Sequence, residues 1–378
     1  MSAHHDGATA LKPIGEVARF QKNLVPADIP KAYALKPMFK NIASEENIRN
    51  GVVAFRDFLY LFFDRLISDG HLYAKPPKKP SGMADYPFMH NITNLLVDIG
   101  YHGRLAEGRD SLSIAEIPTC AASVDGNGKR KPPKIPASNL FECLRFLTLC
   151  GFAFNGVDLK AKTFAASQAQ PLEVLYPNNP ILLTGLKALS IAEMELRTTR
   201  RYWNDNNLLR CDYRPMKAED TDMLDVLKDF LHPLPAKIQK FAIKLHQRYV
   251  DMGMTCTMSI LGDVNFSYAH INNNRKALLP RDAYALRVWE FSYSMKNGYC
   301  IFVRAKRTDK HADVIAKFHS TLREKVARGY GCDRKLRDER CQGGCQGIRL
   351  PLDGSILDIS KDIETWLDIE AAGKRSAD

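Results

Sequence analysis

The chain of 378 residues lacks the features that would place it quickly in a class. It has no run of 18 or more apolar residues, so a membrane-spanning helix is not expected. The N-terminal sequence MSAHHDGATALKPIG lacks the basic and apolar segments of an export signal. We therefore expect a cytoplasmic protein without a membrane partner.

Catalytic signatures are also missing. The sequence contains no G-x-S-x-G, no H-E-x-x-H, no phosphate-binding G-x-x-x-x-G-K-[ST] and no pair of C-x-x-C motifs. Six of the nine cysteines are scattered singly, and nine is an odd number, so reduced thiols are expected rather than a disulfide framework. The sequence thus leaves open whether the protein is an enzyme.

What the chain does have is positive charge. Its formal net charge is +11, although hydrophobic (45%) and charged (26%) residues are present at ordinary levels. Residues 301–350 carry 13 Lys and Arg against 6 Asp and Glu, whereas residues 351–378 carry 3 against 7. This distribution fits either an acidic partner such as nucleic acid or a solvated helix face.

Three cysteines gather in the segment GCDRKLRDERCQGGCQG, with the spacing C-x8-C-x3-C. Cys332, Cys341 and Cys345 could supply three thiolates to a structural zinc ion, with His319 as the fourth ligand. Cys300 and His311 are alternative fourth ligands. Free thiols, or a redox-active pair formed by Cys341 and Cys345, are the other interpretations of this Cys loop.

A nucleic-acid-binding face is the second candidate site. Its residues are Arg304, Lys306, Arg307, Lys317, Lys325 and Arg328. A helix over residues 311–329 would place Lys317 and Arg328 on one face, with Lys325 next to that face. Contacts with phosphates would be independent of sequence and sensitive to salt.

The sequence pattern predicts that the N-terminal half is mainly helical. Apolar residues recur every three or four positions from Ile48 to Leu66, which predicts a helix over 45–69 with Ser44 as its N-cap and Gly70 as its stop. Further helices are expected at 86–99, ending at Gly100, at 138–150 and at 180–200. Residues 1–43 contain four prolines and little periodicity, so an extended arm is expected there.

Two passages of this half look alike. NLLVDIGYHG and RFLTLCGFAFNG each contain the end of an apolar helix, a glycine, an aromatic residue and a second glycine. This helix–turn unit is a weak internal repeat. It could belong to a winged helix or to any packing unit of helix and strand, and its helices carry few basic residues.

The C-terminal part differs from the N-terminal half in composition and is expected to form strands. Segments 255–261, 264–270, 288–294 and 298–306 are rich in β-branched and aromatic residues. Asn297-Gly298 is a strong hairpin signal between the last two. Alternation puts Trp289, Phe291 and Tyr293 on one face, which favours a core; an open face would instead take a base or a small aromatic ligand.

Four stretches carry a resemblance to known sequences: PLPAKIQKFAIKLHQRYVDMG, ARGYGC, GGCQGIRLPLDGSILDIS and DIETWLD. The region they span, most of residues 140–370, resembles a widespread family of uncharacterised bacterial proteins. The resemblance implies a recurring bacterial module, and it supplies no catalytic residues.

Together these observations predict an α+β protein. We expect an arm (1–43), a helix-rich domain (44–215) with two helix–turn units, for which a winged helix is one interpretation, and an antiparallel two-layer α/β sandwich (216–378) with a Cys-rich loop. The leading functional hypothesis is a non-enzymatic protein that binds nucleic acid or a small ligand. Such a protein could have a regulatory role. The alternatives are an enzyme with a site on the C-terminal sheet and a scaffold for protein interactions.

Overall fold

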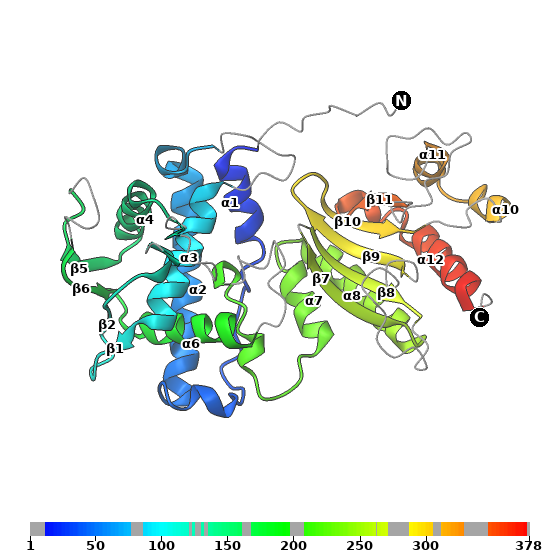
Figure 1. Ribbon diagram of the computed structural model, residues 1–378. Coiled ribbons are helices and arrows are strands. Elements are labelled where there is room, and N and C mark those ends of the chain that lie inside the picture. Colours follow the sequence, from blue (N-terminus) through cyan, green and yellow to red (C-terminus); the bar gives the residue numbers. More distant parts are fainter. Residues whose placement is uncertain are drawn as a thin grey trace. The chain divides into compact units, whose positions relative to one another are not determined.

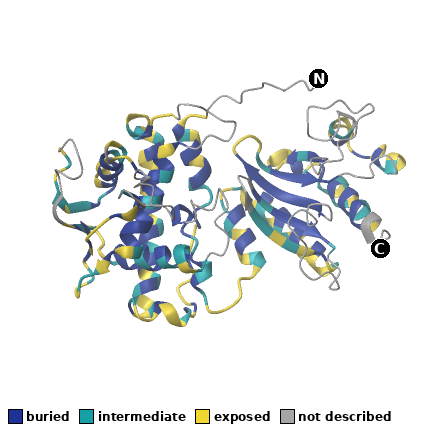
Figure 2. Cartoon of the chain, in the orientation of Figure 1, coloured by how far each residue is buried: buried dark blue, intermediate teal, exposed yellow. Residues whose placement is uncertain are grey.

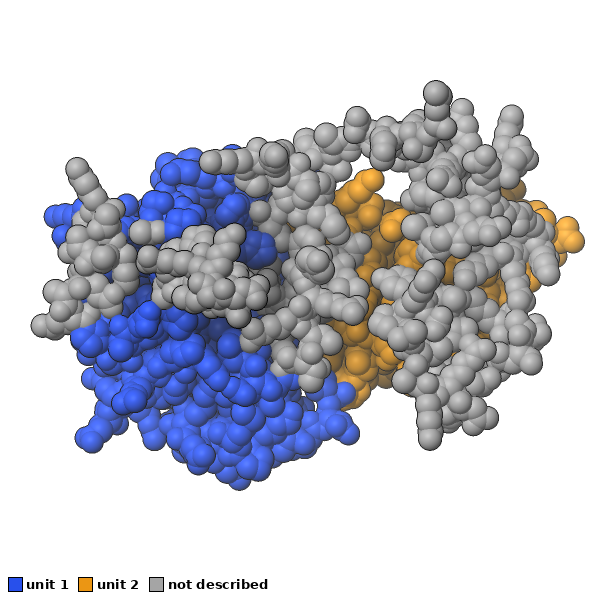
Figure 3. All heavy atoms as spheres, in the orientation of Figure 1, with its two compact units in different colours: residues 1–221 blue, residues 222–378 orange. Residues whose placement is uncertain are grey.

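A computed structural model of the chain shows an α+β protein with two antiparallel sheets (Figure 1). It describes residues 12–76, 86–120, 123–124, 130–131, 135–160, 168–196, 208–261, 263–270, 287–304, 311–328 and 347–375. The chain divides into two compact units, Met1–Thr221 and Asp222–Asp378 (Figure 3). No helix in the described part of the chain is long and apolar enough to cross a membrane.

Unit 1 is built around helices that share one apolar core. Its helices are α1 (Ile14–Lys22), α2 (Glu45–Tyr73), α3 (Pro87–His102), α4 (Ala137–Leu149) and α6 (Ile181–Glu195). Short 3-10 turns are η1 (Pro37–Phe39), η2 (Pro118–Cys120), η4 (Leu208–Arg210) and η5 (Arg214–Met216). The long helix α2 is the centre of the unit because α1 and α6 both pack along it.

The start of α2 follows the sequence pattern, and the predicted face from Ile48 to Leu66 is buried. Ser44 caps the helix by accepting a hydrogen bond from the Asn47 N–H at 3.2 Å. Two other expectations were wrong. Residues 14–22 form helix α1 instead of an extended arm, and α2 and α3 run past Gly70 and Gly100.

Gly100 serves packing rather than termination. A Cβ atom on Gly100 would lie 2.2 Å from the Ser190 hydroxyl of α6. A second close approach occurs between α2 and α6, where a Cβ atom on Gly185 would lie 2.1 Å from the Gly51 carbonyl oxygen. Glycine at these positions therefore allows three helices to approach closely.

A four-stranded sheet flanks these helices, in the order β1-β2-β6-β5. Its strands are β1 (Arg104–Leu105), β2 (Ser111–Ile114), β5 (Ala153–Val157) and β6 (Gln168–Leu175), and a separate ribbon pairs β3 (Ser123–Val124) with β4 (Arg130–Lys131). Each of the two predicted helix–turn units leads into an outer strand of this sheet, β1 after α3 and β5 after α4. The winged-helix interpretation of these units stays a prediction.

Unit 2 has a five-stranded antiparallel sheet in the order β11-β10-β9-β8-β7. The strands are β7 (Thr255–Leu261), β8 (Asp263–Ala269), β9 (Arg287–Ser294), β10 (Gly298–Val303) and β11 (Ile348–Pro351). The helices are α7 (Met223–Leu231), α8 (Ala236–Asp251), α10 (Ala312–Ile315), α11 (Ser320–Arg328) and α12 (Ser360–Arg375), with the 3-10 turn η7 (Gly354–Ile356). The predicted β9–β10 hairpin is confirmed, and Gly298 has the positive φ of 62° that its turn requires.

The predicted helix over 311–329 is divided in two. After α10 the N–H groups of Lys317 and Phe318 donate to carbonyls three residues back, which tightens the chain into a turn. The next N–H, that of His319, donates to Asp362 of α12 at 2.7 Å, and α11 begins after it. A contact with α12 thus interrupts a sequence whose local pattern is helical.

One face of the five-stranded sheet is the core of unit 2. Trp289, Phe291 and Tyr293 lie on it and are at most 6% exposed, so the face is closed and does not offer an open stacking surface. Phe230 of α7 packs on Phe266 with ring centroids 4.8 Å apart, and Tyr249 of α8 packs on Trp289. Helix α12 lies beside α8, joined to it by the Lys244–Glu364 ion pair.

Candidate functional site

The opposite face of this sheet is polar. Side chains on paired residues point to the same side, so the register places Ser267, Glu290, Phe302 and Arg349 in one row across β8, β9, β10 and β11. A second row contains Asn265, Ser292 and Cys300. All eight residues of β9 are nevertheless buried, including those that point to the polar side (Figure 2).

Glu290 is the centre of the polar face and is 1% exposed. One carboxylate oxygen, Oε2, accepts hydrogen bonds from the Ser267 hydroxyl at 2.8 Å and from Arg287 at 3.3 Å. The other oxygen, Oε1, accepts a hydrogen bond from Arg304 at 2.5 Å. Both oxygens are therefore held by donors, two of which are cationic.

Phe302 adds a second link between the cations. The guanidinium carbon of Arg304 lies 4.0 Å from the centroid of its ring, and that of Arg349 lies 4.2 Å away. Both distances suit cation–π contacts. Arg304 therefore belongs at once to the ion pair with Glu290 and to the stack with Arg349. We call Arg287, Glu290, Phe302, Arg304 and Arg349 the arginine cluster.

Most of the arginine cluster is buried. Arg287 and Arg304 are 7% and 6% exposed, while Arg349, on the edge strand β11, is half-buried. Two guanidinium groups thus pair with one carboxylate, and that of Arg349 stacks on the Phe302 ring beside them. Charged groups that are buried away from water need compensating partners. Because their desolvation can cancel the attraction between them, a buried ion pair need not stabilise the fold. Planar guanidinium groups are well suited to hold carboxylate or phosphate groups, which makes this cluster a candidate site.

The described residues of the predicted nucleic-acid face lie on different elements of unit 2. Arg304 lies in the arginine cluster, whereas Lys317 is exposed in the turn between α10 and α11. Lys325 is half-buried on α11, which is a separate helix, so the helical projection that joined it to Lys317 is wrong. Lys306 and Arg307, together with the side chain of Arg328, lie outside the described residues.

Of the four predicted zinc ligands, His319 is the one among the described residues. His319 is exposed, and its Nδ1 accepts a hydrogen bond from the Thr321 N–H at 3.4 Å. Cys332, Cys341 and Cys345 lie outside the described residues. Within the described ranges, no group of three His, Cys, Asp or Glu side chains could hold a metal ion. The zinc loop therefore stays a prediction.

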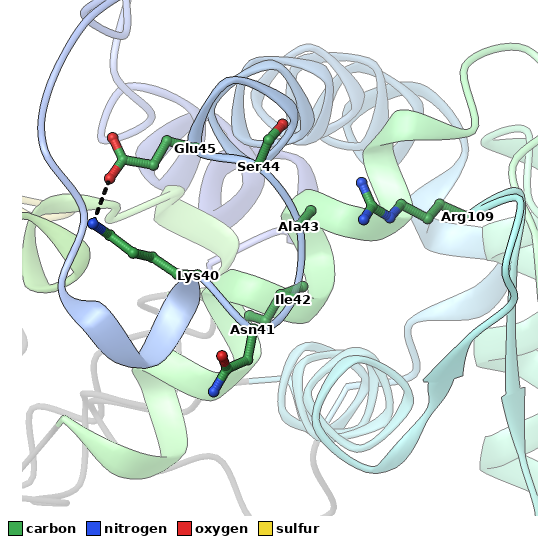
Figure 4. Close-up of a pocket in the computed structure, with 7 residues that line it drawn as sticks. All are labelled: Lys40, Asn41, Ile42, Ala43, Ser44, Glu45 and Arg109. Atoms are coloured by element: carbon green, nitrogen blue, oxygen red, sulfur yellow. Dashed lines mark ion pairs between the residues drawn. The ribbon is translucent and has the colours of Figure 1, made fainter.

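A shallow hollow of about 380 Å³ lies in unit 1, at the start of α2 (Figure 4). Arg109, from the turn between β1 and β2, points toward it, and Lys40 forms an ion pair with Glu45 at 3.5 Å. The Lys40 side chain is 61% exposed, so its charge is already balanced and screened by water. This hollow is a weaker candidate than the arginine cluster.

The comparisons add no relative from which a function could be taken. No family model, no curated protein and no solved structure matches the chain. The resemblance to uncharacterised bacterial proteins therefore stays a prediction as well, and the functional argument rests on the geometry of the site.

Proposed function

We propose that the protein binds a small anionic ligand at the arginine cluster. The observation that carries the proposal is a sheet face on which three arginines gather, two of them paired with the buried Glu290 and the third stacked on Phe302. An anion with two or more oxygens suits planar guanidinium donors, which bind carboxylate and phosphate groups in pairs. The half-buried Arg349, on the edge strand, provides the side from which a ligand arrives.

Binding is a better account of this geometry than catalysis. Both oxygens of Glu290 accept hydrogen bonds from protein donors, so neither is placed to take a proton from a substrate. A polymer such as nucleic acid would not reach Arg287 and Arg304, because both side chains are less than 10% exposed and are covered by other atoms. A small anion needs only access at Arg349, on the edge strand β11.

Thermal unfolding in the presence of anions tests the proposal. Sodium phosphate, pyrophosphate and citrate would each be compared with chloride at equal ionic strength. We expect at least one of them to raise the Tm saturably, because a ligand at about 100 times its Kd adds about 2.7 kcal/mol of stability. Equal Tm values in all four salts would contradict the proposal.

Two variants locate the effect. Arg349→Met removes the guanidinium that stacks on Phe302 at the edge strand, and it should abolish the stabilisation by the anion. Lys317→Met removes an exposed cation of the same unit and should leave the stabilisation unchanged. A gel-mobility shift of DNA that Lys317→Glu abolishes and Arg349→Met preserves would instead support the nucleic-acid hypothesis.

A further inference from the structure

Strand β7 forms one outer edge of the five-stranded sheet in unit 2 (Figure 1). It pairs with β8 over its seven residues, from Thr255 to Leu261, without a shift in register. Within the described residues no strand pairs with its other side, so backbone N–H and C=O groups point outward there. Thr255 and Thr257 are exposed, and the edge is therefore accessible to another chain.

The other outer strands of the two larger sheets are protected against such pairing. β1 has two residues, and β5 has a register shift between Asn155 and Val157. β11 has four residues, carries Arg349 and ends at Pro351. Short strands, irregular pairing, charge and proline are the features by which natural sheets keep their edges from joining other chains. β7 has none of them, because its sequence TCTMSIL is uncharged, lacks proline and is regularly paired.

We propose that β7 pairs antiparallel with β7 of a second copy of the chain, so that the sheets of two copies of unit 2 join into one continuous sheet. The two-fold axis passes through the middle of the strand, at Met258, and is perpendicular to the sheet. Thr257 of one copy then lies opposite Ser259 of the other. A two-fold axis is the commonest symmetry of protein assemblies, and it uses the same surface of both copies.

Strand β7 is its own complement in polarity. Met258 lies opposite Phe266 of β8, on the core face, whereas Thr257 lies opposite Ser267, on the polar face. Because the axis is perpendicular to the sheet, each face of one copy continues into the same face of the other. Residues on the core face therefore meet each other, and hydroxyl-bearing residues meet hydroxyl-bearing residues. Since β7 is uncharged, no like charges of the two strands face each other.

The size of the contact sets its expected strength. A seam of two seven-residue strands is smaller than a standard protein interface, which buries about 1,200 Å² or more, so the dimer should dissociate on dilution. Sedimentation velocity of the full-length protein, from low micromolar to millimolar concentration, should show a monomer that converts to a dimer. Protein that stays monomeric over this range would overturn the proposal.

Hydrogen exchange locates the contact. The outward N–H groups of β7 exchange freely in the monomer and are hydrogen-bonded to the second copy in the dimer. Peptides that cover residues 255–261 should therefore gain protection as the concentration rises, whereas peptides that cover β11 should not. A dimer that leaves the exchange of residues 255–261 unchanged uses another surface and would contradict the proposal.

A charge on the edge tests the same pairing. Thr257→Lys places a cation at an exposed position of β7, which is how natural sheets block such pairing. Each copy contributes one lysine, so the Kd of the dimer should rise about tenfold or more. Thr365→Lys makes the same change at an exposed threonine of α12 and should leave the Kd unchanged. An equal rise in both variants, or no rise with Thr257→Lys, would count against β7. If Thr257→Lys does not fold, hydrogen exchange of the unaltered protein still decides the question.

Discussion

At the scale of single residues, His246 links the stability of unit 2 to pH. Its folded-state pKa is lowered, mainly by burial, so the unfolded chain binds a proton more readily than the folded one. The resulting stability is fully present above pH 6.5 and is lost as pH falls below that value. The imidazole must then either become charged while buried or leave its site.

We therefore predict a pH-dependent effect of His246→Gln on the free energy of unfolding. The unaltered protein should lose more stability than the variant between pH 7.5 and 5.5, as measured by urea unfolding at each pH. His71→Gln is the control, because His71 is exposed at the end of α2. Parallel pH curves for the unaltered protein and His246→Gln would show that the imidazole carries no linked proton.

The Cys loop supports a second prediction at this scale. If Cys332, Cys341 and Cys345 bind zinc, the purified protein should contain about one zinc ion per chain by elemental analysis. Cys345→Ser should then lower both the metal content and the Tm, because binding energy at a structural zinc site is folding energy. Metal-free protein with a Tm that chelator does not change would exclude the zinc site.

At the scale of elements, the contact between α2 and α6 depends on two glycines. Alanine normally stabilises a helix interior by about 1 kcal/mol relative to glycine. Gly185→Ala should have the opposite effect, because its Cβ would lie 2.1 Å from the Gly51 carbonyl oxygen. We expect a loss of about 1–3 kcal/mol, the usual cost of overpacking, measured by urea unfolding.

Gly108→Ala is the matched control in unit 1. Its new Cβ would meet atoms no nearer than 3.4 Å, which is ordinary contact, so its stability should change little. If the two variants were equally stable, the close approach of α2 and α6 would not be the reason for glycine at position 185.

The elements that were predicted well are those whose local signals agree with their surroundings. The α2 pattern and the Asn297-Gly298 turn needed no distant information. The division of α10 from α11 could not be predicted, because it depends on Asp362, 43 residues away from His319 in the sequence. Helix α1 was missed because it is short and lies among prolines, although Ile14, Val17 and Ala18 already have helical spacing.

The arginine cluster illustrates the same limit. Alternation along VWEFSYS already places Glu290 opposite Trp289 and Phe291, so a polar face could have been inferred from β9 alone. The partners of Glu290 are Ser267 on β8, Arg287 at the start of β9 and Arg304 just after β10. The pairing that brings Ser267 and Arg304 to Glu290 is not specified by any local pattern. An acidic residue in an otherwise apolar or hydroxyl-bearing strand was the available signal.

At the scale of the whole molecule, the chain consists of two units with separate cores. The large apolar cluster runs from Ile14 to Met216 and lies within unit 1, while Trp289 and Trp366 are buried in unit 2. We predict that residues 222–378 alone fold cooperatively, with circular dichroism of an α+β domain and a single thermal transition. A fragment that is soluble but lacks a cooperative transition would show that unit 2 depends on unit 1.

The sheet order β1-β2-β6-β5 has a consequence for how unit 1 could be divided. Each helix–turn unit supplies an outer and an inner strand, and the two inner strands, β2 and β6, pair antiparallel from Ser111–Leu175 to Ile114–Leu172. A cut in the chain between β3 and β4 would leave each fragment with one open inner edge, and each edge is the natural complement of the other. Two separately made pieces would rejoin along the β2–β6 seam, in the β3–β4 ribbon and where α6 packs on α2 and α3, so restoring unit 1 requires all of these contacts.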